Sequence, residues 1–589
     1  MVPAQPLPVS VPDIFGLSTC GWRRALGLSS RGHFHATQRS PGLESVSVVL
    51  FLLLAVVVSG AVSRMLPWSV PTPLVQIVLG GAIGLSTSYS VSLDPELFLL
   101  LFLPPLLFLD GWRIPKDELF KDVSTVVELA LGLVLTTVIG MGLFIHWMIP
   151  AMPLAVAFAL AAVVSPTDPI AVSAIAARVP IPKRMMHILE GESLLNDASG
   201  LVCLRFAVAA ALTGTFSAGD AALSFLWVAG AGLAIGVAVT VVVSRAKAWV
   251  TRGWGEDTGS QILVSLLIPF GSYMLAEHFH ASGILAAVGA GVTMTFAEIS
   301  REAMAVTRMR RNSVWDTIQF TLNGIIFVLL GEQLPGILYE ARQTVAVTGH
   351  SQPGWLALYV VAIVAGLAAL RFAWVWLSFK FTILRRRQTG SLPDSALRSP
   401  NWRLVAAMSF AGVRGAITLA GVLTLPLALG DGTPFPARDL AIFLAAGVII
   451  VSLILASIAL PVLLKGLTMP GEPSKQAEED AARVATAEAA IRAIERHQHR
   501  LAEERGDADR FAAAGGRVMD LYRERIEGLS EDERDAVRAQ EKLFREFRLV
   551  GVKAERATLA DLIRSRQVGS ATIRKLTREL DLSEARLRG

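Results

Sequence analysis

Charged residues are scarce in this chain. Asp, Glu, Lys and Arg make up 17% of its 589 residues, whereas hydrophobic residues make up 53%. A soluble globular protein carries about 25% charged residues, so too few are present here to cover the apolar surface in water. The scarcity indicates that most of the chain lies in a bilayer, and the abundance of apolar residues excludes an intrinsically disordered chain.

Cysteine is nearly absent as well. The two residues, Cys20 and Cys203, are far apart in the sequence, which excludes a disulfide-stapled secreted scaffold and any cysteine metal or redox motif. The sequence also has no Gly-rich phosphate loop of the Walker type, which argues against a pump driven by ATP. Its Lys and Arg residues lie between apolar runs instead of forming one patch, so we expect no nucleic-acid partner.

What the chain does have is a series of long apolar runs. A transmembrane helix needs roughly 20 apolar residues. About thirteen segments qualify, and they predict an all-α polytopic membrane protein: Ser45–Leu66, Val70–Ser86, Leu93–Leu109, Val123–Ile149, Met152–Val179, Ile188–Leu212, Ala222–Ser244, Ser260–Phe279, Ala281–Ala297, Val314–Leu334, Trp355–Phe379, Arg403–Leu429 and Leu440–Leu464.

Basic residues are concentrated in alternate loops between these segments. They are Arg113, Lys116 and Lys121; Arg178, Lys183 and Arg184; Arg245, Lys247 and Arg252; Arg301, Arg308, Arg310 and Arg311; and Lys380, Arg385, Arg386 and Arg387. The positive-inside rule places this set in the cytoplasm. With an odd number of spans, the charged C-terminal tail is then cytoplasmic too, and we expect a multi-pass protein of the cell (inner) membrane.

The two ends of the chain differ from the membrane part, residues 44–468. Residues 1–43 are rich in Pro and Ser, have no sustained apolar run and are expected to form a disordered extension. In residues 469–589, apolar positions recur at helical spacing between charged ones. This pattern predicts a cytoplasmic helical domain, which either packs passively on the membrane part or has a regulatory or dimerising role.

The fifth predicted span contains the string Ser165-Pro166-Thr167-Asp168-Pro169. Two prolines so close together remove backbone donors and break a helix. The carbonyls freed by a break must be satisfied by protein, water or an ion, and broken helices of this kind bind ions in secondary transporters. The alternative is a simple proline kink with Asp168 capping the second half-helix.

The sixth predicted span begins with Glu190-Gly191-Glu192-Ser193-Leu194-Leu195-Asn196-Asp197. Ser193 and Asp197 are four residues apart and therefore share a helix face. A hydroxyl and a carboxylate on one face suit a hard cation, and a proton competes with a cation for a buried carboxylate. The alternative is a structural cluster of hydrogen bonds.

A third unusual charge lies in the twelfth predicted span, where Gly412-Val413-Arg414-Gly415-Ala416 places an arginine between glycines. An arginine inside the membrane stays protonated and needs a partner. We expect an ion pair between Arg414 and Glu192, which leaves Asp197 to bind ions. In the alternative, Arg414 reaches the cytoplasmic headgroups.

Together these strings resemble the monovalent cation:proton antiporter-1 family, which includes animal sodium/proton exchangers and prokaryotic relatives of the NhaP type. The match also includes Phe102-Leu103-Pro104-Pro105-Leu106-Leu107-Phe108, so it covers most of the membrane part. The resemblance implies inverted repeats, broken crossing helices and a homodimer, with no cofactor. Relatives often carry a carboxylate where Leu109 stands here. Asp110 follows one position later, about 100° around a helix, and is not expected to be a ligand.

The resemblance also implies roles for individual residues. Asp197 is the carboxylate that binds the ion or the proton, and Asn196 beside it helps to hold the core together. Ser193 and the Thr167 backbone contribute oxygens to a monovalent cation, with Asp168 nearby in the helix crossing. Glu192 and Arg414 are the structural ion pair.

The leading functional hypothesis is therefore electroneutral exchange of Na⁺, K⁺ or Li⁺ for H⁺ at Asp197. A passive cation channel is the alternative, although the sequence has no repeated selectivity-filter string. A membrane enzyme is disfavoured because His146, His187, His278 and His280 fall at the edges of predicted loops. Selectivity between Na⁺ and K⁺ depends on cavity size and ligand number, so the sequence leaves it open.

Overall fold

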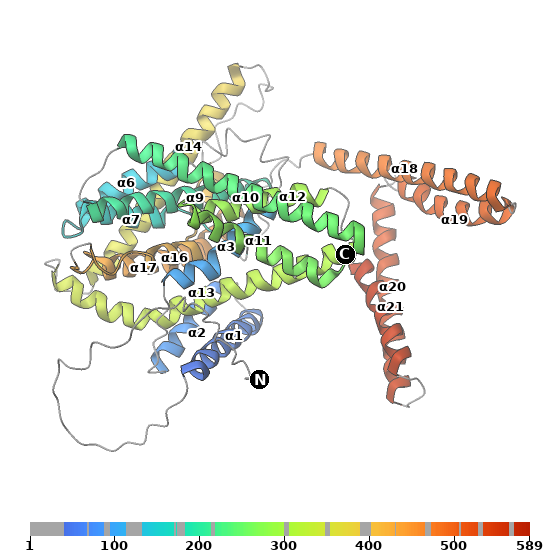
Figure 1. Cartoon of the computed structure of the whole chain (residues 1–589), viewed down its shortest axis with the longest axis horizontal. Helices are drawn as coiled ribbons and strands as arrows, with labels where there is room; N and C mark the ends of the chain where they lie inside the picture. The colour runs from blue at the N-terminus through green and yellow to red at the C-terminus, as the bar shows by residue number, and fades with distance from the viewer. Residues whose placement is uncertain are drawn as a thin grey trace, which may run out of the picture. The chain divides into compact units, whose positions relative to one another are not determined.

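The structure is a computed structural model of the whole chain (Figure 1). It describes residues 41–66, 70–86, 95–113, 132–169, 172–173, 183–213, 218–299, 305–347, 354–388, 402–429, 432–465, 473–505, 508–527, 534–564 and 570–588. Within these ranges the chain is helical, and its β pairing consists of one isolated bridge between Ala428 and Pro434. The chain divides into two compact units, Met1–Leu467 and Thr468–Gly589, which are described separately below.

The first unit is a bundle of apolar helices. These are α1 (Pro41–Met65), α2 (Thr72–Ser86), α3 (Pro95–Arg113), α6 (Leu133–Met148), α7 (Leu154–Val164), α9 (Lys183–Thr213), α10 (Ala218–Trp254), α11 (Thr258–His278), α12 (Gly283–Ile299), α13 (Ala305–Val347), α14 (Gly354–Gln388), α15 (Trp402–Phe410), α16 (Ala416–Leu423) and α17 (Arg438–Leu464). Helices α7 and α17 contribute many buried side chains to the core.

Each predicted apolar segment overlaps one of these helices or, for Arg403–Leu429, the broken pair α15 and α16. Among the described helices, five are by themselves long and apolar enough to cross a membrane: Trp227–Trp254, Thr258–His278, Val306–Tyr339, Gly354–Lys380 and Arg438–Leu464. The extension 1–40, most of Val123–Gly132 and the loop residues Lys116, Lys121, Arg178 and Arg301 lie outside the described residues.

Glycines allow several helices of this unit to touch backbone to backbone. A Cβ added at Gly80 of α2 would lie 2.0 Å from the carbonyl oxygen of Val328 in α13, and one at Gly331 of α13 would lie 2.0 Å from that of Ile77 in α2. The same relation joins α12 to α3, where a Cβ on Gly291 would lie 2.0 Å from the oxygen of Phe108. Small residues are the usual means of close helix packing in a membrane, where no hydrophobic force brings helices together.

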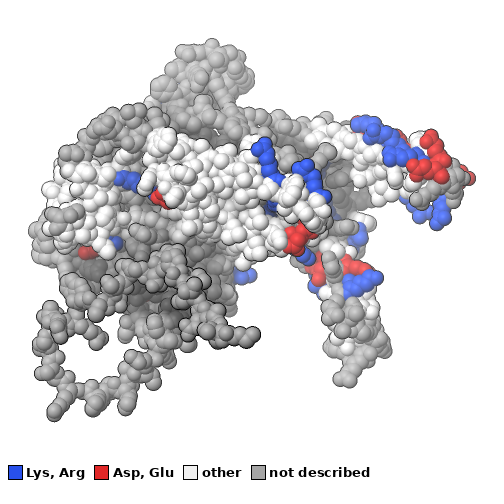
Figure 2. Space-filling view, in the orientation of Figure 1, with Lys and Arg blue, Asp and Glu red and all other residues white. Residues whose placement is uncertain are grey.

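The second unit consists of two helix pairs. Helix α18 (Pro473–Arg505) packs against α19 (Ala508–Glu527), and α20 (Arg534–Arg564) packs against α21 (Ser570–Arg588). Arg556 of α20 joins the second pair by donating to Asp581 at 2.7 Å and to Glu584 at 2.6 Å. Figure 2 shows blue and red side chains mixed along these helices, whereas the visible described surface of the first unit is mostly uncharged.

Candidate ion-binding site

Two interrupted helices meet at the centre of the first unit. Helix α7 ends at Val164, and Ser165–Asp168 are not helical. The second interruption lies between α15 and α16, at residues 411–415. The backbone N–H of Asp168 donates to the carbonyl of Val413 at 2.7 Å, so the two breaks touch. Two prolines explain the first break, and the backbone groups freed by both breaks are brought to one place.

Gly415 is required at this contact. A Cβ built on Gly415 would lie 1.8 Å from Oδ2 of Asp168, a distance at which no pair of atoms can remain. The Asp168 side chain therefore occupies the space that any larger residue at position 415 would need. This is the physical reason for one of the two glycines that flank Arg414 in the sequence.

We expect Gly415→Ala to lower transport strongly because Asp168 must move and the crossing of the two breaks must shift with it. The matched control is Gly421→Ala in α16, where the added methyl group would lie 3.3 Å from Leu201 and meets only side-chain atoms. Cation-dependent proton flux and thermal unfolding are measured for both variants. Equal flux in the two variants would show that the position of Asp168 is unimportant.

Helix α9 supplies a row of buried polar side chains to the same place. Ser193 and Asp197 are each 3% exposed, and Asn196 is fully buried. The Ser193 hydroxyl lies 2.8 Å from the carbonyl oxygen of Thr167 and 3.3 Å from Oδ2 of Asp197. Asn196 fixes the α7 break by donating to the Thr167 hydroxyl at 3.1 Å and accepting from the Thr167 N–H at 3.3 Å. The structure thus brings together Thr167, Ser193, Asn196 and Asp197, and their role in binding an ion stays a prediction.

A small cavity lies beside these residues. Its volume is about 20 Å³, and it is lined by Leu106, Asp110, Pro166, Thr167, Asp168, Pro169, Ser193, Asp197, Asn323, Gly415, Ala416, Ile417 and Thr418. A space of ~10–15 Å³ by this measure holds one water molecule. The cavity therefore has room for one water or one small ion, next to two carboxylates of the crossing, Asp168 and Asp197.

Asp110 also lines this cavity, although sequence reasoning set it aside on its one-residue shift. It lines a second cavity of about 260 Å³ as well, together with Arg113, Pro169, Ser173, Glu190, Ser193 and Gln319. The two cavities share Asp110, Pro169 and Ser193, so we refer to the larger one as the vestibule of the smaller. Asn323 of α13 is a further lining residue that no sequence pattern indicated.

Arg113 and α13 border the vestibule. The Arg113 guanidinium donates to Oε1 of Gln319 at 2.7 Å and forms an ion pair with Asp316. Both members of this ion pair are substantially exposed, so the pair contributes little to stability. Its position, however, places one positive charge at a cavity that also contains Asp110 and Glu190.

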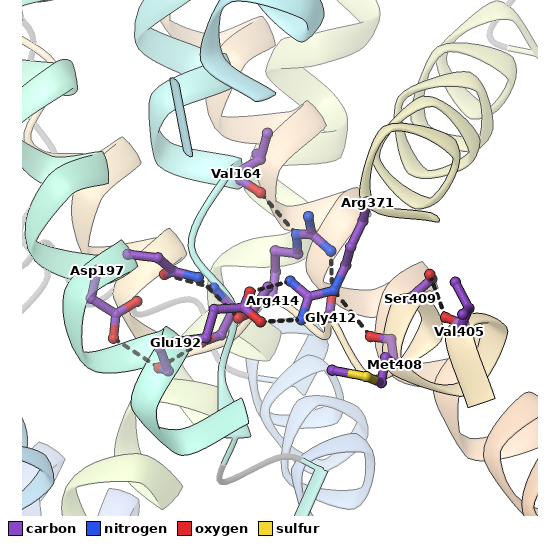
Figure 3. A network of polar contacts seen from close by, with 12 residues as sticks. Val164, Glu192, Asp197, Arg371, Val405, Met408, Ser409, Gly412 and Arg414 are labelled. Atoms are coloured by element: carbon purple, nitrogen blue, oxygen red, sulfur yellow. Dashed lines mark hydrogen bonds and ion pairs between the residues drawn. The ribbon is translucent and has the colours of Figure 1, made fainter. Parts of the chain in front are cut away.

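Glu192 has a different partner from the predicted one. Its carboxylate accepts two hydrogen bonds from Arg371 of α14, at 2.5 Å to Nη1 and 2.8 Å to Nη2 (Figure 3). Both side chains are buried, with exposures of 1% and 2%. Arg371 is fixed further by donating from Nε to the carbonyl of Met408 at 3.0 Å. The predicted Glu192–Arg414 pair was therefore wrong.

Arg414 is instead held by the backbone of the two breaks. Its Nε donates to the carbonyl of Val164 at 2.8 Å, and its Nη1 donates to that of Gly412 (Figure 3). Its own N–H donates to the Ser452 hydroxyl at 3.2 Å. The arginine is 5% exposed, so it does not reach the headgroups. The carbonyls of Val164 and Gly412, freed by the two breaks, thus take the place predicted for Glu192.

Among the described residues, no group of three or more His, Cys, Asp and Glu side chains is arranged to hold a metal ion. The oxygens around the small cavity are different in kind. They include carboxylate oxygens, the Ser193 hydroxyl and the Thr167 carbonyl, a set that suits a hard cation.

The sequence matches a family of known proteins. Residues 49–466 match the model of the transmembrane sodium/hydrogen exchanger family. The chain belongs to this family. The resemblance to monovalent cation:proton antiporters is thereby confirmed.

Individual exchangers of this family cover most of the chain. It is 42% identical over 552 residues to an Escherichia coli protein named "Uncharacterized Na(+)/H(+) exchanger YjcE", covering 92% of this chain and 99% of that one. It is 39% identical over 532 residues to the "Sodium, potassium, lithium and rubidium/H(+) antiporter" of Bacillus pumilus, covering 89% and 75% of the two chains. Among solved structures, the sodium proton antiporter MjNhaP1 of Methanocaldococcus jannaschii at pH 8 matches with a TM-score of 0.55 and 18% identity, covering 72% of this chain and 99% of that one. This exchanger therefore has the NhaP fold.

Proposed function

We propose that this chain exchanges monovalent cations for protons and that Asp197 binds the two in turn. Its relatives are named as exchangers of Na⁺ and, in Bacillus, of Na⁺, K⁺, Li⁺ and Rb⁺, which supports exchange and a broad choice of cation. The observation that carries the assignment to Asp197 is the arrangement at the small cavity. There a buried carboxylate, a hydroxyl that contacts it and an interrupted helix surround a space for one ion.

The Ser193 hydroxyl gives Asp197 two alternative states. Ser193 has one hydroxyl hydrogen but two acceptors in reach, the Thr167 carbonyl and Asp197 Oδ2. When Asp197 carries a proton, it can donate to Ser193 Oγ while Ser193 donates to Thr167, so all three groups are satisfied. When Asp197 is ionised, a cation beside it takes the place of the missing proton. Cation and proton thus compete for one site.

The same arrangement supports electroneutral exchange. Arg371 and Arg414 are both held by hydrogen bonds, and an arginine does not release its proton at working pH. If Asp197 is the one carboxylate of the three at this cavity that exchanges its proton, one proton moves for each monovalent cation. A channel is disfavoured because the small cavity has a volume of only about 20 Å³, which does not provide a continuous polar pathway.

The test uses the full chain in proteoliposomes loaded with a pH-sensitive dye. We expect proton flux on addition of Na⁺, Li⁺ or K⁺, and none with choline. The Na⁺-driven rate is then compared with and without valinomycin at equal K⁺ on both sides, which clamps the potential at zero. Equal rates confirm electroneutral exchange. Since one charge moving through 100 mV corresponds to about 2.3 kcal/mol, a net charge movement would give faster flux under the clamp. Flux of Na⁺ without any proton movement would indicate a channel.

The membrane arrangement belongs to this proposal. We take the predicted segments as thirteen spans in the cell (inner) membrane, with inverted repeats that place the fifth and twelfth spans at the crossing. The basic loops and residues 469–589 then lie in the cytoplasm. The family resemblance supports a homodimer, which the mass of the detergent-solubilised protein tests; a monomer mass in a stable, active preparation would contradict it.

The C-terminal unit is proposed to regulate exchange without contributing to its chemistry. The boundary between the compact units lies between Leu467 and Thr468, and the described residues at the candidate site all precede it. A chain ending at Glu472, before α18 begins, should insert and still exchange, with a changed pH response or a weaker dimer. Flux is measured against pH for both lengths. Complete loss of flux in a truncated chain that inserts normally would place part of the transport machinery in the tail.

A further inference from the structure

A basic cavity lies apart from the ion-binding site, among α10, α11, α12 and α13. Its volume is about 290 Å³. Four positively charged residues line it: Arg245, Lys247 and Arg252 of α10, and Arg311 of α13. No Asp or Glu is among the described lining residues, and none of the lining residues borders the small cavity at Asp197 or its vestibule. The size is close to the lower end of the roughly 300–1,000 Å³ typical of ligand pockets.

The cationic groups are presented by a preformed framework. Arg311 is 1% exposed, and its guanidinium carbon lies 5.1 Å from the centre of the Trp112 ring. Such an arginine is fixed in place before any ligand arrives, so little side-chain entropy is lost when one binds. Arg245 and Arg252 are more exposed and lie on the face of α10 that also carries Ala248 and Thr251. The cavity thus has one basic side chain that is fixed by burial, Arg311, and others that are more exposed and can adjust to a ligand.

A buried amide in the wall has unused hydrogen-bonding capacity. Gln261 of α11 is 6% exposed, and its Nε2 donates to the Thr251 hydroxyl at 3.1 Å. Its Oε1 is buried and accepts no hydrogen bond from any described group. If the amide is turned, Oε1 accepts from Thr251 and the two N–H donors face the cavity. An anion in the cavity would then satisfy the amide fully. The four basic residues that line the cavity outnumber the one carboxylate that acts on Arg311, that of Glu256, so the cavity favours an anion over a cation.

Two exposed aromatic residues lie on the same end of α10 as the cavity residues Ala248, Thr251 and Arg252. Trp249 and Trp254 of α10 are 65% and 74% exposed, with ring centres 5.3 Å apart. Exposed tryptophans of membrane proteins are concentrated at the level of the lipid headgroups. An anion available at that depth is the phosphate of a lipid headgroup, and basic pockets between transmembrane helices are the known type of site for such headgroups.

From these observations we infer that the basic cavity binds a phosphate-bearing anion, supplied by an anionic phospholipid or by phosphate in solution. Arg245, Lys247, Arg252 and Arg311 neutralise the phosphate, and Gln261 donates a hydrogen bond to it. The acyl chains of a lipid ligand would lie along the exposed apolar surface of α10, which includes Val242 and Val250.

The lipid source is tested with the full chain in detergent. Protein is mixed with equal amounts of phosphatidylglycerol and phosphatidylcholine that have the same acyl chains, and the retained lipid is counted by native mass spectrometry. We expect preferential retention of phosphatidylglycerol. In the double variant Arg245→Gln/Arg252→Gln, affinity should fall by roughly tenfold to thirtyfold, because each Lys or Arg near an anionic headgroup contributes roughly fivefold. Gln261→Leu should weaken retention as well, and it is available if the double variant does not fold.

The matched control is Arg308→Gln/Arg310→Gln, which removes two exposed positive charges near the start of α13 that do not line the cavity. The free-anion source is tested by adding inorganic phosphate to lipid-free protein and measuring thermal unfolding. Lipid preference lost only in the cavity variants supports a headgroup site. A phosphate-induced rise in unfolding temperature that only the cavity variants lose supports a site for soluble phosphate. If the cavity variants match the control in both measurements, the inference is overturned.

Discussion

Asp197→Asn is expected to abolish cation-driven proton flux while the protein stays folded and inserted. Asparagine has the same shape and can still accept the hydrogen bond from Ser193, so the contacts at the α7 break remain. Asparagine neither releases a proton nor supplies a negative charge. Cation and proton therefore no longer compete for position 197, and exchange depends on that competition. Flux in proteoliposomes with Na⁺, K⁺ and Li⁺ measures the loss, and thermal unfolding in detergent checks the fold.

Asp316→Asn is the matched control for this change. It removes the same functional group from an exposed position, where Asp316 pairs with Arg113 at the edge of the vestibule. Transport should continue in this control. Asp110→Asn provides a second comparison, because Asp110 lines both cavities. If Asp110→Asn eliminates flux and Asp197→Asn does not, the binding carboxylate is Asp110 and the assignment to Asp197 fails.

Arg371→Gln is expected to be the most destabilising single change at the site. It would leave the Glu192 carboxylate buried, at 1% exposure, without the two hydrogen bonds that Arg371 donates. Removing one partner of a buried ion pair costs about 3–5 kcal/mol, most of it because the remaining charge is uncompensated. The unfolding temperature in detergent should fall accordingly.

The double variant Glu192→Gln/Arg371→Gln distinguishes the stability lost with the ion pair from the stability lost with each side chain alone. Two neutral amides can hydrogen-bond to each other, so much of the lost stability should return. Arg113→Gln is the control for losing an arginine at an exposed ion pair, and it should cost at most about 1 kcal/mol. Strictly additive effects of Glu192→Gln and Arg371→Gln would mean that the pair seen in the structure does not act as a unit.

The helical segments, and the juxtaposition of most residues of the candidate site, could be predicted from the sequence for a clear physical reason. A run of apolar residues long enough to cross a bilayer allows few structures other than a helix. Within such runs, a broken helix at Pro166 and Pro169 and a polar row at Ser193, Asn196 and Asp197 stand out. Contacts between the break and the polar row are then expected, because buried polar groups need hydrogen-bond partners.

The partner of Glu192 could not be predicted in the same way. The sequence contains three arginines well inside apolar runs, Arg205, Arg371 and Arg414, and any of them can neutralise a buried carboxylate. Which arginine pairs with Glu192 depends on the directions of the backbone carbonyls at the two breaks. The carbonyls of Val164 and Gly412 accept hydrogen bonds from Arg414, and Glu192 is then bound by Arg371. Arg371 had one visible signal, which is its position in the middle of the Trp355–Phe379 run.

Asp110 was set aside for a related reason. A shift of one residue turns a side chain by about 100° on an isolated helix, which argues against a shared function. Here, however, α3 contains Pro104 and Pro105 and packs closely on α12 through Gly111 and Gly291. The rotation of such a helix about its axis is set by the helices packed against it. The position of Asp110 relative to Asp197 therefore depends on tertiary packing, which cannot be predicted from a single sequence.

The size of the small cavity has a consequence for how an ion reaches Asp197. A space of about 20 Å³ admits the ion but not its hydration shell, so dehydration must take place in the vestibule, which at about 260 Å³ is large enough for an ion with its waters. The oxygens of Asp110, Glu190 and Ser193 are there to replace water one ligand at a time. Mg²⁺ releases its waters reluctantly and usually keeps several of them. We therefore expect Mg²⁺ to be retained in the vestibule and not to be exchanged, because removing its waters costs too much free energy.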